Sequence, residues 1–417
     1  MNSLEDWIRE QTRHSIAALL RSISPTVTKT RTGFGQVIVP RKGCVVASPV
    51  PAAYDPDPDY FFHWYRDSAI VMDALRLVQD MVPDARQHFR DFVRFSLDLM
   101  ALDGRRAPQD WRARAETEFA RFLRKDLQAI SGEAIFAETR VNPDGTLDII
   151  DWPRPQHDGP ALRALTVLRW GVENADEETL LRADLDFVLG HARKPCFDIW
   201  EEEVGLHYYT LRVCEAALKE GGLRLEDRDA SLAGRCFTEA SILARLLDDY
   251  WLPEEQYIRS RILATGRSAK ELDISVILAA NHAGEPRRMP LVATLDKLAA
   301  LFGSAYPINR DRSGAPAMGR YAGDMYYSGG AYYFSTLAAA EFCYRSADLT
   351  RGDGFLETVR RFTPAGGDLS EQFDQNSGTQ TSAKNLAWSH AAFLSCAAAR
   401  QALVAQPCNP TASSAPH

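Results

Sequence analysis

Helical periodicity runs through this chain from its first residues almost to its last. Apolar residues recur at positions i, i+3, i+4 and i+7, and residues suited to helix caps bound the periodic stretches. Residues 84–101 are an example, with Phe89, Phe92 and Leu97 on one face and Asp84 placed to act as the N-cap. The pattern predicts an all-α protein with few strands.

The periodic stretches number about a dozen. Pro160 suits the first turn of one helix, and Gly221 and Gly222 suit the C-cap of another. No linker rich in Pro, Gly or Ser separates the stretches, so we expect one domain over residues 1–405 and a flexible tail at 406–417. Successive helix pairs suit a toroid of helical hairpins, although periodicity alone also allows a solenoid or a large bundle. The helices are expected near residues 3–22, 67–81, 84–101, 113–130, 160–172, 177–190, 207–220, 229–250, 268–281, 290–302, 330–346, 353–362 and 383–403.

Composition and charge exclude several classes of protein. Hydrophobic residues make up 45% and charged residues 25% of the 417 residues, which is typical of a globular protein and excludes a disordered or fibrous chain. The net charge of -8, with acids and bases interspersed, is not that of a nucleic-acid binder. Charged residues interrupt the apolar residues of the first twenty positions, so we expect no signal peptide, no membrane span and a cytoplasmic location.

The seven cysteines are scattered along the chain. They form no CxxC pair and have no His-rich partner spacing, so the sequence indicates neither a structural zinc site nor a disulfide framework. We expect buried, reduced thiols, and we expect no metal ion and no cofactor.

Four polar segments between the predicted helices concern function, because a barrel of hairpins gathers its connecting loops on one concave face. The first covers residues 58–75. It places Tyr60 and Trp64 just ahead of a helix that begins with Arg66 and Asp67. An adjacent Arg and Asp can both hydrogen-bond to sugar hydroxyls, although Asp67 could instead cap the helix and pair with Arg66.

The second segment covers residues 151–165. Trp152 is followed closely by Arg154, and a loop Trp flanked by Arg suits stacking on the apolar face of a pyranose. An ordinary packing role for Trp152 is the alternative. The Asp-Gly-Pro sequence at 158–160 indicates helix capping rather than chemistry.

The third segment, residues 197–210, contains three consecutive glutamates directly after Trp200. A solvated charge run is the usual meaning of such a triplet. Here Trp200, Tyr208 and Tyr209 flank it, and an apolar setting raises the affinity of a carboxyl for its proton, as a general acid requires.

The fourth segment, residues 368–393, is a polar loop that leads into the last helix and carries Glu371 and Gln372. It could be a merely flexible loop. However, a carboxylate far in sequence from the first cluster is what hydrolysis of a glycosidic bond by two carboxyl groups needs.

Together these segments resemble the glucoamylase family, glycoside hydrolase family 15, in the order of that family and over roughly residues 40–400. The matching pieces are VVASP at 45–49, PDYFxxWxRDS at 58–68, RPQxDGPALRA at 154–164, DIWEE at 198–202, GRYxxDxYY at 319–327 and SEQFDxxxGxQxSAxxLxWSxA at 370–391.

The resemblance implies an (α/α)6 barrel of twelve helices in two concentric rings, with the active site at one mouth. It implies that Glu201 is the general acid, that Glu202 binds sugar hydroxyls, and that Glu371 is the general base which activates a water molecule. Such an enzyme inverts the anomeric centre and releases β-glucose from the non-reducing ends of α-linked gluco-oligosaccharides. The substrate-binding residues implied by the resemblance are Tyr60, Trp64, Arg66, Asp67, Trp152, Arg154, Trp200, Glu202, Arg320, Asp324, Gln372 and Trp388.

The sequence also departs from the family. Residues 329–332 read Gly-Gly-Ala-Tyr where fungal relatives carry Gly-Asn-Pro-Trp, and Gly323 replaces an acidic residue. Both positions border the subsite of the leaving sugar, so α-1,6 glucosides and trehalose remain alternative substrates. No starch-binding module follows residue 405, so short oligosaccharides are expected rather than granular starch. A non-catalytic sugar sensor is the alternative from another class, and the presence of both Glu201 and Glu371 argues against it.

Overall fold

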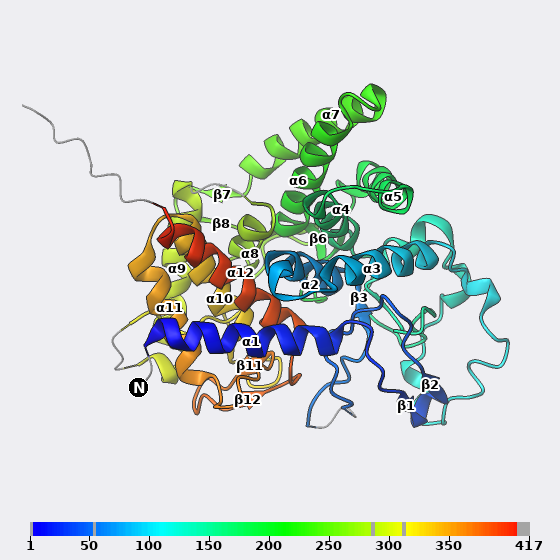
Figure 1. The fold of residues 1–417 in the computed structure, drawn as a ribbon, viewed down its shortest axis with the longest axis horizontal. Coiled ribbons are helices and arrows are strands. Elements are labelled where there is room, and N and C mark those ends of the chain that lie inside the picture. Colours follow the sequence, from blue (N-terminus) through cyan, green and yellow to red (C-terminus); the bar gives the residue numbers. More distant parts are fainter. Residues whose placement is uncertain (1–2, 53–55, 285–287, 311–313, 407–417) are drawn as a thin grey trace, which may run out of the picture.

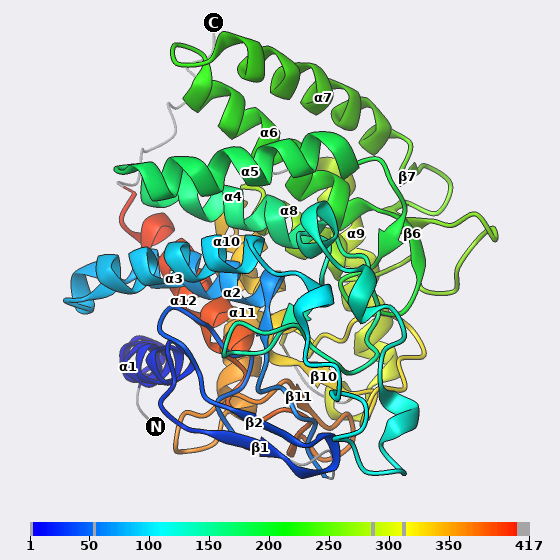
Figure 2. The ribbon, with the colours of Figure 1, turned by 90° about the vertical axis from the view of Figure 1, so that its right-hand side faces the viewer.

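The computed structural model describes residues 3–52, 56–284, 288–310 and 314–406, and this part of the chain contains twelve α-helices. The even-numbered helices form a closed inner ring, because each contacts the next and the last contacts the first (Figures 1 and 2). These inner helices are α2 (Tyr65–Leu77), α4 (Asp158–Trp170), α6 (Tyr208–Leu225), α8 (Ser275–His282), α10 (Tyr333–Arg345) and α12 (Ala387–Val404).

The odd-numbered helices cover the ring from outside. For example, α1 packs on α12, α7 on α6, and α11 on α10. The predicted (α/α)6 barrel is therefore confirmed. The outer helices are α1 (Leu4–Ser22), α3 (Ala85–Met100), α5 (Ala175–His191), α7 (Ala230–Asp248), α9 (Met289–Ala305) and α11 (Leu349–Phe362).

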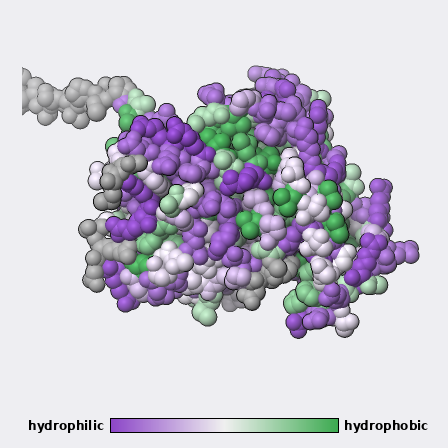
Figure 3. All heavy atoms as spheres, turned by 60° about the horizontal axis from the view of Figure 1, so that its bottom comes forward, coloured by the Kyte–Doolittle hydropathy of each residue, from purple (hydrophilic) through white to green (hydrophobic). Residues whose placement is uncertain are grey.

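Composition explains which helices lie inside. In α10 every residue but Arg345 is buried, because the helix carries apolar or small side chains on all of its faces. In α3 only one stripe is buried, which includes the predicted Phe89 and Phe92, and charged residues cover the opposite face. Accordingly, hydrophilic side chains dominate the face of the molecule shown in Figure 3, where hydrophobic ones form one large patch and several smaller ones.

Short antiparallel strands tie the loops together. Strand β3 directly precedes α2, β6 precedes α6 and β10 precedes α10, so the paired loops meet at the N-terminal ends of inner helices. The pairs and sheets are β1 (Lys29–Arg31) with β2 (Gln36–Ile38); β3 (His63–Trp64) with β4 (Arg140–Val141); β5 (Cys196–Phe197), β6 (Val204–His207) and β9 (Arg261–Ile262); β7 (Trp251–Leu252) with β8 (Tyr257–Ile258); and β10 (Ala331–Tyr332), β11 (Gln372–Phe373) and β12 (Gln380–Thr381). The 3-10 helices are η1 (Thr32–Phe34), η2 (Gln79–Met81), η3 (Gly104–Arg106), η4 (Ala120–Phe122), η5 (Leu127–Ala129), η6 (Gly132–Ile135) and η7 (Pro307–Asn309).

The helix expected at 113–130 does not form, and that prediction was wrong. The segment contains only the short helices η4 and η5. Its backbone hydrogen-bonds to distant parts of the chain instead, since the Arg124 N–H donates to the Ile149 carbonyl at 2.9 Å. The Arg124 side chain is buried and ion-paired to Glu138 at 2.9 Å. These tertiary bonds replace the i to i−4 bonds of a helix.

Features predicted at three helix ends also differ from the structure. Helix α8 begins at Ser275 rather than near 268, because the Asp273 carboxylate accepts a hydrogen bond from the Ser275 N–H at 2.7 Å and fixes the preceding loop. Asp84 occupies the N-cap position of α3 without a capping hydrogen bond from its side chain. Gly221 and Gly222 lie inside α6 rather than at its C-cap. A Cβ atom there would lie 2.7 Å from Leu185 and 2.8 Å from Phe237, so both glycines let neighbouring helices approach closely.

The cysteines behave as predicted where the structure describes them. Six are buried: Cys44, Cys196, Cys214, Cys236, Cys343 and Cys396. Cys408 and the predicted tail from residue 407 onward lie outside the described residues. Among the described residues, no helix is both long and apolar enough to cross a membrane. The cytoplasmic location stays a prediction.

Candidate active site

A cavity of about 270 Å³ opens where the loops meet at the N-terminal ends of the inner helices. All the predicted site residues except Arg154, Asp324 and Gln372 line it. Most of the predicted site residues, which come from five separate loops, are therefore brought together at one cavity. The complete lining is Ala47, Tyr60, Trp64, Arg66, Asp67, Trp152, Pro153, Ile199, Trp200, Glu201, Glu202, Arg320, Tyr326, Phe334, Glu371, Leu386 and Trp388.

Glu201 stands in a tight turn between β5 and β6. Its backbone adopts a positive φ of 65°, which non-glycine residues rarely do. Asp198 holds this turn, because its carboxylate accepts hydrogen bonds from the N–H groups of Trp200 and Glu202 at 3.0 and 2.9 Å. Asp198 is itself fixed by an ion pair with the buried Arg261 at 2.8 Å. The turn aims the Glu201 carboxyl into the cavity.

Three nitrogen donors converge on the Glu201 carboxylate. The Trp64 indole and the Arg66 guanidinium donate to Oε1 at 2.9 and 3.1 Å. The Trp152 indole donates to Oε2 at 2.5 Å. Trp152 therefore contacts the cavity directly, as the sugar-platform prediction required, and it also orients Glu201.

Glu371 is a buried carboxyl group of the cavity. Its Oε2 accepts a hydrogen bond from the Ser382 hydroxyl, and its Oε1 lies 3.5 Å from the Tyr60 hydroxyl, which also contacts the Tyr326 hydroxyl at 2.7 Å. Burial raises the pKa of Glu371 to about 7, although the Ser382 hydrogen bond and the Arg320 charge oppose the rise. The carboxyl can thus exchange a proton near neutral pH.

This raised pKa predicts that the variant Glu371→Gln melts at a higher temperature than the wild type at pH 8. The carboxyl has a pKa of about 7 in the native state and about 4.3 in the unfolded chain. Between these pH values the native state keeps a proton that the unfolded chain releases, so native stability falls as the pH rises through this window. Above pH 7 the loss is complete and on the order of 3 kcal/mol.

Thermal unfolding followed by circular dichroism at pH 4 and at pH 8 measures this effect. The gain in the variant should be present at pH 8 and absent at pH 4. Glu118→Gln, at an exposed glutamate, is the control and should change neither melting temperature. Equal gains for Glu371→Gln at both pH values would refute the burial argument.

Arg66 and Asp67 occupy the first turn of α2 at the cavity wall. Arg66 pairs with the buried Asp158 at 3.3 Å, and its Nε lies 3.6 Å from Asp67 Oδ2. Burial raises the pKa of Asp67 to about 6, although the Arg66 charge opposes the rise. Asp67 does not cap α2, since the N-cap is Trp64, and within the described residues its Oδ2 lacks a hydrogen-bond partner. The capping role considered for Asp67 is therefore wrong, whereas its pairing with Arg66 is present.

Glu202 belongs to a second charged group of the cavity. It accepts hydrogen bonds from the Tyr321 hydroxyl at 2.7 Å and from Arg320 at 3.1 Å, and it pairs with Lys270 at 2.6 Å. The carboxylate of Asp324 holds the Arg320 guanidinium from behind, at 2.6 and 2.7 Å. Asp324 thus positions a lining residue without lining the cavity.

Three aromatic rings form one wall of the cavity. Trp388 stacks on Phe334 with centroids 4.5 Å apart and an interplanar angle of 8°. Trp200 lies nearly parallel to both rings, at 6.3 and 6.0 Å, and its indole nitrogen donates to Asp273 at 2.8 Å. A flat aromatic wall beside charged groups suits a ligand with an apolar face and polar edges.

The other two residues that do not line the cavity lie behind it. Arg154 pairs with Glu138 at 3.4 Å and lies 3.7 Å from Asp126, and these partners hold its side chain behind the cavity lining. The Gln372 amide donates to the Tyr332 hydroxyl at 2.8 Å and to the carbonyl of the lining residue Tyr326 at 3.1 Å. Their place in the family motifs did not show which way their side chains point.

The sequence did not single out several residues that hydrogen-bond to predicted residues of the candidate active site. Tyr326 and Ser382 stand inside the quoted motifs, which could have singled them out, whereas Lys270 lay unmarked at the edge of a predicted helix. Within the described part of the chain, no group of three or more His, Cys, Asp and Glu residues is placed to hold a metal ion.

The comparison with protein families decides the classification. The family described as Glycosyl hydrolases family 15 matches residues 33–99, 137–352 and 346–398. The chain belongs to this family. Two relatives are glucoamylase 1 of Rhizopus oryzae, 25% identical over 474 residues that cover 96% of this chain and 71% of the relative, and the probable glucoamylase of Schizosaccharomyces pombe, 27% identical over 464 residues that cover 96% and 93%. This family member is a glycoside hydrolase of the glucoamylase type.

Solved structures agree on the fold. The family 15 glucoamylase of Hypocrea jecorina has a TM-score of 0.79 at 24% identity, with 96% of this chain and 73% of that chain covered. The glucoamylase of Saccharomycopsis fibuligera has a TM-score of 0.79 at 22% identity, with 97% and 96% covered. At these identities the likeness shows the barrel and nothing finer.

Proposed function

We propose that this glycoside hydrolase is an exo-acting, inverting α-glucosidase that releases β-glucose from the non-reducing ends of α-linked gluco-oligosaccharides. The observation that carries the proposal is the presence of Glu201 and Glu371, from loops far apart in sequence, in one cavity with an aromatic wall. Two carboxyl groups in such a cavity meet the requirement of glycoside hydrolysis. A pocket of this size, walled on one side by aromatic rings, favours attack on chain ends.

In the proposed reaction Glu201 protonates the oxygen that leaves the anomeric carbon. Glu371, ionised, removes a proton from a water molecule whose oxygen attacks the same carbon from the opposite face, so the bond to the leaving sugar breaks as the new bond forms. The Tyr60 and Tyr326 hydroxyls beside Glu371 can orient that water molecule. Arg66 and Asp67 can bind hydroxyls of the terminal sugar, because one donates and the other accepts.

The raised pKa of Glu371 supports an alternative assignment of the acid and base roles within the same function. A carboxyl that keeps its proton up to about pH 7 has the property of a general acid. In this alternative Glu371 protonates the leaving oxygen and Glu201 activates the water molecule. The resemblance in sequence favours the first assignment.

Product analysis tests the proposed function. The purified protein is incubated with maltotetraose, isomaltotriose and trehalose, and proton NMR follows the products in the first minutes. The expected result is β-glucose from at least one sugar, and the sugar consumed fastest identifies the preferred linkage. Release of α-glucose as the first product from maltotetraose or isomaltotriose would overturn inversion, and internal cleavage products would overturn exo action.

A further inference from the structure

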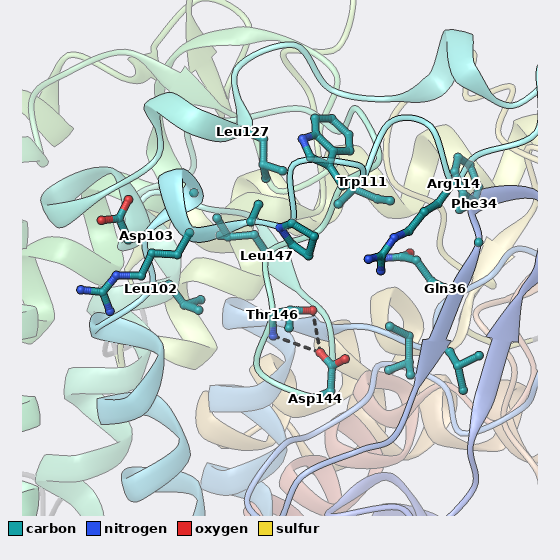
Figure 4. A pocket seen from close by; sticks show the side chains of 18 of the residues that line it. Phe34, Gln36, Leu102, Asp103, Trp111, Arg114, Leu127, Asp144, Thr146 and Leu147 are labelled. Carbon is teal, nitrogen blue, oxygen red and sulfur yellow. Dashed lines mark hydrogen bonds between the residues drawn. The ribbon is translucent and has the colours of Figure 1, made fainter.

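A second cavity lies beside the β1–β2 hairpin (Figure 4). It encloses about 440 Å³, which is more than the candidate active-site cavity and within the range of small-ligand pockets. Its walls come from residues 34–38, residues 101–114 with Leu127, and residues 144–149. In the described part of the chain, the two cavities share no lining residue.

A large part of this cavity is built by a segment outside the family match. The match stops at residue 99 and resumes at residue 137, and the lining residues 101–114 and Leu127 fall in this gap. The second cavity therefore combines walls from the matched stretches at 34–38 and 144–149 with a wall from a segment that the family match leaves out.

The segment is held firmly against the rest of the protein. Gly35 has a φ of 60°, and a Cβ atom there would lie 2.5 Å from the Arg114 carbonyl oxygen. A Cβ atom at Gly104 would lie 1.6 Å from the Leu127 carbonyl oxygen. Only glycine permits these two close approaches, so the walls of the cavity have a defined geometry.

Aromatic and aliphatic side chains form most of the wall. Trp111 and Leu127 lie on one side and Leu147 lies next to them (Figure 4). Trp111 is 7% exposed, and the Arg112 guanidinium packs over its ring at 4.5 Å. These surfaces suit the apolar C–H faces of a pyranose ring.

Polar groups reach the same cavity. Arg114 and Gln36 extend into it from one side, while Asp144 and Thr146 approach from another (Figure 4). The Gln36 Oε1 is buried and lacks a hydrogen-bond partner among the described residues. Leaving such an acceptor unpaired costs about 1–3 kcal/mol, and a ligand hydroxyl can supply the missing donor once the amide turns toward it.

We propose that this cavity is a second binding site for α-linked glucan chains. Guanidinium donors and carboxylate and amide acceptors together match hydroxyl groups, each of which both donates and accepts. A purely apolar ligand would leave the buried Gln36 acceptor unsatisfied. The choice of ligand rests on the proposed function.

The two cavities are joined by one loop. Leu147 and Ile149 line the second cavity, while Trp152 and Pro153 line the candidate active site a few residues later. A glucan held in the second cavity is thereby kept beside the catalytic carboxyls, which raises its effective concentration there.

Isothermal titration with maltohexaose tests the proposal. The titration uses Glu371→Gln as the background, so that the sugar survives, and it counts the sites. The expected stoichiometry is two maltohexaose molecules per protein chain. Adding Ala107→Trp, which fills the cavity, should reduce the stoichiometry to one. Adding Gln36→Leu removes the unpaired acceptor at similar volume and should raise the dissociation constant of the second site by about tenfold. Ala113→Trp places the same side chain at an exposed position of the same segment and should leave two sites.

The outcomes separate this proposal from the proposed function. If the wild type hydrolyses none of the sugars tested above, the proposed function fails. If it hydrolyses them and maltohexaose occupies a single site in every variant, the second site is refuted. A thermal melt confirms that each variant is folded. Binding of the apolar dye 8-anilinonaphthalene-1-sulfonate that Ala107→Trp abolishes and maltohexaose does not displace would also overturn the proposal.

Discussion

Replacing Glu201 by glutamine is expected to slow the hydrolysis of maltotetraose by about 10³–10⁴-fold while leaving the hydrolysis of α-glucosyl fluoride within about tenfold of the wild-type rate. The amide keeps the hydrogen-bonding shape of the side chain and has no proton to give to the leaving oxygen. Fluoride leaves without that proton, so the loss of a general acid affects it little. Initial rates with both substrates measure the difference.

The matched variant Glu371→Gln should lose about 10³–10⁴-fold with both substrates. Every substrate needs an activated water molecule, so the quality of the leaving group cannot compensate for a missing base. Normal binding of maltotetraose to both variants is the control for intact folding of the cavity. If the fluoride instead rescues Glu371→Gln and fails to rescue Glu201→Gln, the roles are reversed, as in the alternative assignment that the raised pKa of Glu371 supports.

The variant Arg66→Met should lower the free energy of unfolding by about 3–5 kcal/mol and reduce kcat/KM by at least about a hundredfold. Arg66 is buried and contacts the carboxylates of Asp158 and Glu201. Methionine fills the space and leaves the completely buried Asp158 without its counter-charge. It also removes a donor from a catalytic candidate. Denaturant unfolding and steady-state kinetics on the same preparation measure the two losses.

Arg163→Met is the matched control for this prediction. Arg163 pairs with Asp184 at 2.9 and 2.7 Å, both side chains are buried, and neither lines the candidate active site. We expect a similar loss of stability, with kcat/KM per folded molecule within about twofold of the wild type. Equal losses of kcat/KM in the two variants would mean that Arg66 acts only through folding stability.

The sequence specified the inner and outer helices well, because their burial follows from composition along one segment at a time. The all-round apolar α10 had to lie inside, and the striped α3 had to lie on the surface of the barrel. The expected helix at 113–130 failed for the converse reason. Its periodicity was real, but the buried Arg124 and its distant partner Glu138 form bonds that no local pattern reveals.

For the candidate active site, the motifs supplied residue types in order, and most of those residues line one cavity. The motifs could not show in which direction each side chain points. Arg154 and Gln372 stand in the same motifs as lining residues, yet their side chains are held by Glu138 and Tyr332 behind the cavity wall. The sequence motif determines which residues lie in a loop. The contacts that each side chain makes with neighbouring segments determine where that side chain points.

The sequence by itself therefore determined the helical hairpins, the family and the two glutamates on which hydrolysis is proposed to depend. Only the tertiary structure decided the raised pKa of Glu371, since burial is a property of the surrounding loops. Only the tertiary structure also revealed the second cavity, whose walls come from three separated stretches of chain. Local propensity is encoded residue by residue, while desolvation and enclosure arise only where distant segments meet.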